Sequence, residues 1–545
     1  MTEMLPDTRP TLGIMGVQNP AVDAVIMVAV DRPGSLPFDA DRLARRLVAT
    51  GPTHRWTSPF APSLGADLPT STAGDVARAA ERARVAQPGW ARRSFEERAE
   101  VLLRFHDRLL DRLRDFVDLV QYDAGKARLT AAEEVLHVGL SARYCAVTAE
   151  RYLRSRRGRG LLPVLTRIDR HYQPKGLVGV IAPWNYPLTM AISDGLAALM
   201  AGNAVLLKPD AQTPFSALAA VDLLSECGLP DDLWTVVNGE GATVGPALIS
   251  TVDYVCFTGS TRTGKTVAGQ CAEQLIGCSL ELGGKNPLLV LADADVDRAA
   301  EGAVRACFSN AGQLCLSAER LFVAESVLDD FTAAFVARTR SLRLGTSTDY
   351  RDQMGGLMNA AQLERVEQHV EDARAHGAVV LTGGRRRPDL GALCYEPTIL
   401  TAVTAEMQCH AEETFGPVVS IFPVRDDAEA IERANASEYG LNASVWTADA
   451  ARGRQVAAQL RCGTVNVNEG YAASFGSLDA PMGGMKSSGL GRRQGSDGLL
   501  RFVEVQSVAT QYGIPLAPRA GLSPDTFVRA VSSAMRLFRR IRRAG

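Results

Sequence analysis

The chain has 545 residues, 46% of them hydrophobic and 22% charged, a composition typical of soluble globular proteins and not of disordered or fibrous ones. With 59 basic and 61 acidic residues its formal net charge is −2, so the overall charge does not favour nucleic acid as a partner. The length exceeds what one hydrophobic core usually spans, so we expect two or three structural units.

The sequence has no long apolar stretch and no leader-like N-terminus. No run reaches the roughly 18 to 20 uncharged residues that span a bilayer, and the first ten residues lack a basic region followed by an apolar core. We therefore expect a cytoplasmic protein. The ten cysteines include no CxxC pair, so neither a metal site nor a disulfide framework is predicted.

The first half of the chain begins with an arm and a long helix. Residues 1–72 are rich in Pro, Gly and Thr and predict an irregular arm with one short apolar segment at 25–30. Residues 94–120 have the apolar periodicity of a single amphipathic helix, opened by a capping box of Ser94 and Glu97.

From residue 176 onward short apolar runs alternate with helical patterns. This alternation predicts βαβ units and a mainly parallel sheet, whose ligands bind beyond the carboxyl ends of the strands. The expected strands of this first α/β unit are 176–185, 204–210, 233–239, 254–260 and 287–293.

A second alternation begins near Asp293 and predicts another α/β unit. Its expected helices are 296–311, 325–341 and 360–376, and its expected strands are 319–324, 378–384 and 418–424.

The last segment, 523–545, predicts an amphipathic basic helix that could touch an anionic membrane surface. We favour the simpler interpretation of a packed or solvent-facing terminal helix. Its arginines are Arg529, Arg536, Arg539, Arg540, Arg542 and Arg543.

Two strand-ending loops have features of a dinucleotide site. In FTGSTRTG, residues 257–264, Gly259 and Gly264 would allow a tight turn and the approach of a phosphate to the next helix N-terminus. In KPDAQTP, residues 208–214, Lys208 could bind ribose hydroxyls or a phosphate. A simple turn and a solvated lysine are the alternatives for each loop alone.

Two further segments contain groups for covalent catalysis. Cys315 lies in FSNAGQLCLSAER, and Glu281 opens ELGGKNP just before an apolar run. A thiolate can attack an aldehyde carbon, a hydride can leave to a nicotinamide, and a carboxylate can activate the water that hydrolyses the thioester.

Eight motifs in order resemble those of the aldehyde dehydrogenase superfamily over residues 70–512. They are PWNYP (183–187), LLKPDAQTP (206–214), FTGSTRTG (257–264), LELGGKNP (280–287), NAGQLC (310–315), EETFGPV (412–418), YGLNASVWT (439–447) and PMGGMKSSGLGR (481–492).

The resemblance implies a role for each matching residue. Cys315 would be the nucleophile, Glu281 the base for deacylation, and Asn185 with the Cys315 backbone N–H the oxyanion hole. The positions that would contact or adjoin the cofactor are Trp184, Lys208, Ala211, Gly259, Ser260, Gly264, Gly283, Glu413 and Phe415.

The resemblance also implies two Rossmann-like α/β domains and a small β element that joins subunits into a homodimer or homotetramer. The expected divisions are an N-terminal arm (1–72), an NAD(P)-binding domain (73–159 and 176–288), a catalytic domain (289–482), the oligomerisation element (160–175 and 497–513) and a basic tail (514–545).

The chain departs from the family at residues that bear on the mechanism and the substrate. Arg493 replaces a glutamate that often assists a proton relay. The pattern is most similar to actinobacterial enzymes that oxidise succinic semialdehyde with NADP, and Ser477 matches their substrate-loop serine. Ser193 and Ser309, however, replace the two arginines that hold the distal carboxylate in better-known members.

Several alternatives remain at this stage. The substrate could be an aliphatic, aromatic or betaine-type aldehyde, coenzyme A could replace water as the acyl acceptor, or the chain could be a non-catalytic member. NADP is the expected cofactor and NAD is possible. Ala211 replaces a glutamate common in NAD-preferring relatives and leaves room for a 2′-phosphate, whereas Asp210 could restore a preference for NAD.

Overall fold

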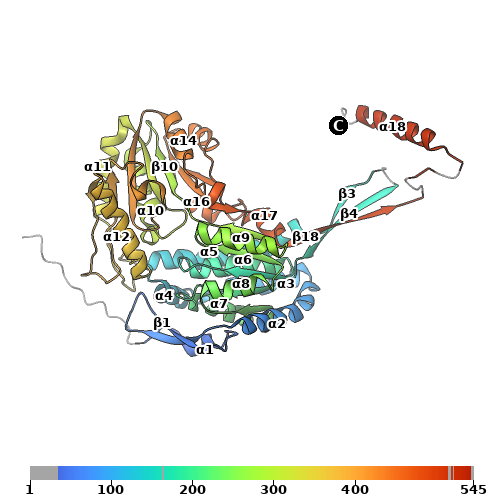
Figure 1. Cartoon of the computed structure of the whole chain (residues 1–545), viewed down its shortest axis with the longest axis horizontal. Helices are drawn as coiled ribbons and strands as arrows, with labels where there is room; N and C mark the ends of the chain where they lie inside the picture. Colours follow the sequence, from blue (N-terminus) through green and yellow to red (C-terminus); the bar gives the residue numbers. More distant parts are fainter. Residues whose placement is uncertain (1–34, 162–164, 514–516, 519–520, 542–545) are drawn as a thin grey trace, which may run out of the picture. The chain divides into compact units, whose positions relative to one another are not determined.

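A computed structural model describes residues 35–161, 165–513, 517–518 and 521–541. The apolar segment predicted at 25–30 lies outside these residues. Figure 1 traces the chain from blue at its start to red at its end. It contains two sheets flanked by helices and a smaller antiparallel sheet.

The predicted irregular arm is wrong for its second half. Helix α1 (Ala40–Ala44) is followed by the antiparallel strands β1 (Thr53–Thr57) and β2 (Gly65–Pro69). Trp56 of β1 is buried, and its Nε1 donates to the Gln212 carbonyl at 2.9 Å. Because anchoring contacts of this kind come from distant segments, local composition did not reveal this structure.

The helix predicted over 94–120 is two helices. The capping box of Ser94 and Glu97 is confirmed at the start of α3 (Phe95–Asp111), which ends at Arg112 with φ −104° and ψ 24°. Helix α4 (Leu113–Ala124) then begins. Periodicity did not indicate this break, because no proline or glycine marks it. The neighbouring helices are α2 (Ala73–Ala91) and α5 (Arg128–Leu153).

The first sheet has six strands in the order β17-β9-β8-β5-β6-β7, all parallel except β17. The strands are β5 (Leu177–Ile181), β6 (Ala204–Lys208), β7 (Trp234–Val236), β8 (Tyr254–Thr258), β9 (Gly277–Glu281) and β17 (Gly489–Leu490).

The sequence did not predict β9, because this short strand has few apolar residues. The run at 287–293, grouped with the first alternation above, forms β10 (Asn286–Val290) near the centre of the second sheet. That strand crosses the expected domain boundary at 288/289. The helices and turns between the strands of the first sheet are α6 (Pro187–Met200), α7 (Phe215–Glu226), η1 (Asp231–Leu233), α8 (Gly241–Ile249) and α9 (Thr261–Glu273).

The second sheet has seven strands in the order β12-β13-β14-β11-β10-β15-β16, all parallel except β12. Its remaining strands are β11 (Ala318–Ala324), β12 (Val379–Thr382), β13 (Thr398–Thr401), β14 (Val418–Val424), β15 (Asn442–Trp446) and β16 (Thr464–Val467).

The helices of this second unit connect its strands, except the last two, which come after β16, and three of them agree with the predicted ranges. They are α10 (Val296–Phe308), η2 (Ser309–Gly312), η3 (Glu325–Val327), α11 (Leu328–Arg340), α12 (Ala360–Ala375), α13 (Gln408–Ala411), α14 (Asp427–Asn435), α15 (Ala450–Ala457), α16 (Ala472–Gly476) and η4 (Lys486–Ser488). The α/β class with mainly parallel sheets is confirmed.

The third sheet is antiparallel, with strand order β18-β4-β3. It consists of β3 (Arg156–Arg159), β4 (Thr166–Pro174) and β18 (Val503–Gln511), and helix α17 (Gly495–Leu500) precedes β18. The chain continues into α18 (Pro524–Ile541). Among the described residues, no helix has the length and apolarity needed to cross a bilayer.

Candidate active site

A cavity of about 620 Å³ brings together predicted site residues from the first sheet and from the loops next to the strands of both large sheets. Its wall includes Cys315, Glu281 and Asn185. It also includes six of the predicted cofactor residues: Trp184, Gly259, Ser260, Gly283, Glu413 and Phe415. In sequence these residues are spread over more than two hundred positions, so only the fold assembles them.

Cys315 follows a strained turn at the end of α10. Asn310 and Ala311 have φ values of 52° and 54°, in the left-handed region, and Gly312 has φ 70°. An added Cβ at Gly312 would lie 2.1 Å from the Gly416 carbonyl oxygen, so the turn needs glycine there. Backbone strain of this kind is typical of functional loops.

The electrostatic surroundings of Cys315 disfavour the thiolate. Burial raises the pKa of its thiol to about 12, and the nearby carboxyls of Glu281 and Glu413 act in the same direction. Arg493 acts in the opposite direction. Attack by this sulfur therefore requires an additional positive charge or a base.

Asn185 lies in the loop after β5, against the turn that precedes the cysteine. Its Nδ2 donates to the Gln313 carbonyl at 3.1 Å, and Asn310 Nδ2 donates to the Asn185 carbonyl at 3.3 Å. An amide nitrogen has two hydrogens, so the side chain retains one donor beyond the bond to Gln313.

Glu281 is the last residue of β9, and its carboxyl is buried. Oε1 has no hydrogen-bond partner among the described residues. Burial raises the pKa of this carboxyl to about 7, against the opposing influence of Arg493. A carboxyl that titrates near neutral pH is suited to general base catalysis.

Arg493, which stands where the family usually has a glutamate, belongs to a buried ionic cluster. Its Nη2 lies 2.5 Å from Asp194 Oδ2, and Arg501 Nη2 lies 2.6 Å from the other oxygen of the same carboxylate. Arg501 also donates to Ser279 Oγ at 2.8 Å, two residues before Glu281. Arg493 contributes to the walls of both the main cavity and a smaller one of about 40 Å³.

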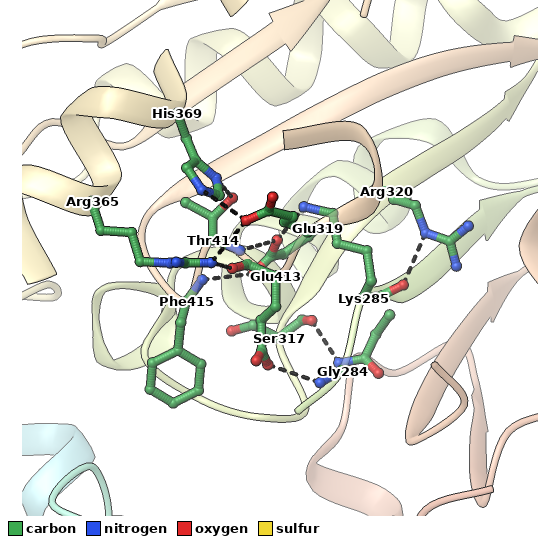
Figure 2. A network of polar contacts seen from close by, with 12 residues as sticks. Gly284, Lys285, Ser317, Glu319, Arg320, Arg365, His369, Glu413, Thr414 and Phe415 are labelled. Carbon is green, nitrogen blue, oxygen red and sulfur yellow. Dashed lines mark hydrogen bonds and ion pairs between the residues drawn. The ribbon is translucent and has the colours of Figure 1, made fainter. Parts of the chain in front are cut away.

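The loop that carries Glu413 and Phe415 is held by a second buried ion pair (Figure 2). Lys285 Nζ lies 2.5 Å from Glu319 Oε2. Glu319 in turn accepts from the backbone N–H groups of Thr414 and Phe415 at 2.9 and 3.0 Å. This network aims the Phe415 ring at the cavity, where it meets Trp184 edge-on with 5.5 Å between ring centroids.

Glu413 itself accepts from the Gly284 N–H at 2.8 Å, the contact at the lower edge of Figure 2. Burial raises the pKa of its carboxyl to about 8, and the charge of Glu319 adds to the effect. Gly283 is needed beside it, because an added Cβ there would lie 2.4 Å from Glu413 Oε2.

The turn after β8 offers a site for an anionic group. Ser260 is the N-cap of α9 and accepts from the Thr263 N–H, and the wall of the cavity continues through Thr261 and Arg262. The N-terminus of a helix of this length favours phosphate. The donor set, the cavity size and the aromatic pair of Trp184 and Phe415 fit a dinucleotide.

Gly264 is not on the wall of this cavity, and its predicted role in cofactor binding stays a prediction. It lies inside α9, away from the cavity wall, and an added Cβ would lie 2.4 Å from Leu282 Cδ2. Its small size serves the packing of the helix against the chain after β9. A glycine three residues into a helix cannot be distinguished from a phosphate-binding glycine by spacing alone.

Neither Lys208 nor Ala211 is among the described residues that form the wall of this cavity. Lys208 ends β6 and is buried, with Nζ donating to the Pro209 carbonyl at 3.0 Å. Asp210 Oδ1 accepts from the backbone and side-chain nitrogens of Gln212 at 3.0 and 3.2 Å, so that oxygen is already engaged.

The serines considered as substrate contacts are also absent from the wall of the cavity that contains Cys315. Ser309 is on the wall of a separate cavity of about 580 Å³ and donates to the Arg305 carbonyl at 2.8 Å. Ser477 follows α16 as its C-cap and is not on the wall of any of the three cavities described above. Ser193 faces the smaller cavity, where its buried Oγ has no partner among the described residues.

Sequence reasoning did not identify Asp194, Arg501 and Tyr186, whose contacts near the cavity form only in the folded chain. Asp194 and Arg501 lie some three hundred positions apart and meet only in the folded chain. Tyr186, beside the predicted Asn185, also lines the main cavity, and the Lys126 ammonium lies 3.6 Å from the centroid of its ring. The motif PWNYP contained the signal for Tyr186, whereas nothing local identified Asp194.

Comparison with known proteins agrees with this geometry. A family model described as the aldehyde dehydrogenase family matches residues 49–508. A protein of Mycolicibacterium smegmatis named "Putative succinate-semialdehyde dehydrogenase (NADP(+))" is 52% identical over 475 residues, which is 87% of this chain and 92% of the relative.

Two solved structures have the same fold. One, described as an NADP-dependent enzyme of E. coli, has a TM-score of 0.80 and 33% identity, covering 84% of this chain and 95% of its own. The other, an aldehyde dehydrogenase of Bacillus cereus in complex with NAD+, has a TM-score of 0.80 and 35% identity, covering 84% and 93%. The chain, with its cysteine, carboxyl and amide on one cavity wall, therefore belongs to the aldehyde dehydrogenase family.

Proposed function

We propose that this protein oxidises an aldehyde to a carboxylate with a nicotinamide dinucleotide, through a covalent intermediate on Cys315. The observation that carries the proposal is the presence of Cys315, Glu281 and Asn185 on the wall of one cavity. A nucleophile, a base and an oxyanion donor are the groups that such acyl chemistry requires.

In the first step the Cys315 thiol releases its proton to solvent, and the sulfur adds to the aldehyde carbon to form a thiohemiacetal whose oxygen carries the negative charge. The free hydrogen of Asn185 Nδ2, with the backbone N–H of Cys315, stabilises the oxygen that becomes negative. Bound NADP+ would accept the hydride that leaves this carbon, and its cationic ring would favour the thiolate.

In the second step the resulting thioester is hydrolysed. Glu281 takes a proton from water, the hydroxide attacks the acyl carbon, and the carboxylate product leaves as the sulfur is released. The unpaired, buried Oε1 of Glu281 supports this role, because it has acceptor capacity that nothing else uses. Retention of this carboxyl favours water over coenzyme A as the acceptor.

We propose NADP as the preferred cofactor, with NAD as an alternative. The relative named above has NADP in its printed name, and the Bacillus structure contains NAD+. Ala211 leaves space where a glutamate would repel a 2′-phosphate, and the bonds of Asp210 to Gln212 reduce the competing influence of that carboxylate.

We propose succinic semialdehyde as the substrate, on the strength of the relative's printed name. Ser193 and Ser309 provide no charge for the distal carboxylate. Arginine side chains do occur on the walls of the two neighbouring cavities, Arg493 beside Ser193 and Arg305 beside Ser309. Ser477 remains a candidate substrate contact by its match to the same group.

We also propose that the third sheet joins subunits, with residues 73–159 and 176–288 binding the cofactor and 289–482 providing the nucleophile. The exposed side chains of Val505 and Val508 on edge strand β18 support this role, because apolar side chains on a free strand edge favour pairing with another chain. A homodimer or homotetramer follows.

The test is a kinetic panel of succinic semialdehyde, aliphatic, aromatic and betaine aldehydes with both cofactors, with the products analysed in the presence and absence of coenzyme A. We expect free succinate from succinic semialdehyde as the best reaction. The Cys315→Ala variant should bind cofactor normally and lose at least a thousandfold in rate, about 4 kcal/mol. Greater retention of activity would exclude Cys315 as the nucleophile, and a preferred aldehyde without a carboxylate would exclude the proposed substrate.

A further inference from the structure

Helix α18 separates its side chains into two faces. At 3.6 residues per turn, the apolar residues Phe527, Val528, Val531, Met535 and Leu537 fall on one half of the helix. Arg529, Arg536 and Arg539 fall on the other half, together with Ser532 and Ser533. So clean a separation is typical of a helix that lies at an interface between apolar and aqueous surroundings.

The apolar face of α18 is not covered by the described part of the chain. Val528 is 61% exposed, Met535 68% and Leu537 59%. Several large apolar side chains exposed together on one helix indicate a binding surface, whereas a single exposed one would not.

The charged residues of the polar face are nearly all positive. From Pro524 onward the sequence contains six arginines and a single acidic residue, Asp525, whereas the whole chain is nearly balanced at 59 basic and 61 acidic residues. Asp525 forms an ion pair with Arg529, and among the described residues Arg536 and Arg539 form no ion pair with an acidic side chain.

This helix lies outside the part of the chain that the family model matches. The family model ends at residue 508, before the helix begins, and no residue of α18 lines the cavity of Cys315. The chemistry proposed above therefore gives no reason for either face.

We propose that α18 binds the surface of an anionic lipid bilayer. Its apolar face would enter the boundary between headgroups and acyl chains, and its arginines would contact lipid phosphates. A nucleic acid would satisfy the arginines and leave the apolar face in water. A second copy of the helix would cover the apolar face but bring like charges together. An anionic bilayer satisfies both faces at once.

The experiment uses the full-length protein and two kinds of vesicle, phosphatidylcholine alone and phosphatidylcholine with an equal part of phosphatidylglycerol. Flotation measures the bound fraction at low and high salt. We expect at least tenfold tighter binding to the anionic vesicles, reduced by salt because surface charge is screened.

Two sets of substitutions separate the faces. V531S with M535S and L537S should abolish vesicle binding without changing the charge, and R529Q with R536Q and R539Q should remove the preference for anionic vesicles. Ser532→Ala with Ser533→Ala is the matched control on the polar face and should bind as the wild type does. Aldehyde oxidation in solution should be the same in all of them, since no residue of α18 lines the cavity of Cys315.

The proposal would be overturned if the wild type does not float with anionic vesicles, or if the apolar-face variant floats equally well. Sedimentation velocity provides the remaining outcome. If the apolar-face variant dissociates an oligomer while vesicle binding is absent, a second copy of the chain covers α18 and the lipid proposal is wrong.

Discussion

The Cys315 thiol and the Glu281 carboxyl share a cavity in which burial acts on both in the same direction. Removal from water disfavours each charged form, which raises the pKa of the thiol to about 12 and that of the carboxyl to about 7. The two groups therefore differ in protonation at neutral pH: the thiol is neutral, while the carboxyl is close to half ionised.

This difference predicts the pH dependence of turnover. A general base works only when deprotonated, so kcat should rise between about pH 6 and pH 8 as Glu281 loses its proton. Glu281→Gln should lack this rise and should give a burst of reduced cofactor followed by slow turnover, because the acyl group forms but is not hydrolysed. Stopped-flow absorbance across this pH range measures both. A variant without any burst would mean that Glu281 acts before hydride transfer.

We predict that the small side chain of Ala211 decides the cofactor preference. Ala211→Glu should lower kcat/KM for NADP and leave that for NAD the same or higher, because a carboxylate repels the 2′-phosphate and can accept from the ribose hydroxyls. Steady-state kinetics with both cofactors measures the ratio, with Ala211→Gln as an uncharged control of similar size. A wild type that favours NAD tenfold, about 1.4 kcal/mol, would contradict the role of Ala211.

At the scale of an element, the loop from Glu412 to Val418 is positioned by the ion pair of Lys285 and Glu319, which is not on the wall of the cavity. Lys285 and Glu319 are both buried, and Glu319 holds the backbone of Thr414 and Phe415 (Figure 2). Glu319 therefore acts as a positioning residue for the cavity wall.

Glu319→Gln should destabilise the fold by about 3–5 kcal/mol, because it leaves the Lys285 ammonium buried without its partner. Urea unfolding measures this change. The double variant Lys285→Met with Glu319→Leu should recover part of that stability and still raise KM for NADP, since Phe415 loses its anchor. Unchanged KM values in both variants would show that the loop keeps its position without Glu319.

At the scale of the whole molecule, the third sheet leaves strand β18 on its edge with Val505 and Val508 exposed. Val505→Lys with Val508→Lys should weaken subunit association, because charges on an edge strand oppose pairing with another chain. Sedimentation velocity over a range of concentrations measures the shift, and Val505→Thr with Val508→Thr is the control that keeps strand propensity. An unchanged oligomer in the lysine variant would place the interface elsewhere.

The sequence alone determined the family, the α/β class and four of the six strands of the first sheet, whereas it predicted β11, β12 and β14 of the second sheet and missed β13, β15 and β16. Motifs of the family are local, and so are the apolar runs of buried parallel strands, such as those at 177–181 and 204–208. The motifs also identified Cys315, Glu281 and Asn185 as candidate catalytic residues, because each occupies a fixed position in its motif and has a side chain suited to the role.

Tertiary structure decided the features that depend on distant partners. The assignment of β10 to the second sheet and the packing of Gly264 against Leu282 each depend on contact with another segment, and the break at Arg112 has no proline or glycine that marks it in the sequence. Tertiary structure also decided the contacts of Arg493. The sequence showed only that an arginine replaces the glutamate expected at this position. Its buried pairing with Asp194 next to Glu281 exists because α6 and the chain after β17 meet, and no local pattern encodes a contact across some three hundred residues.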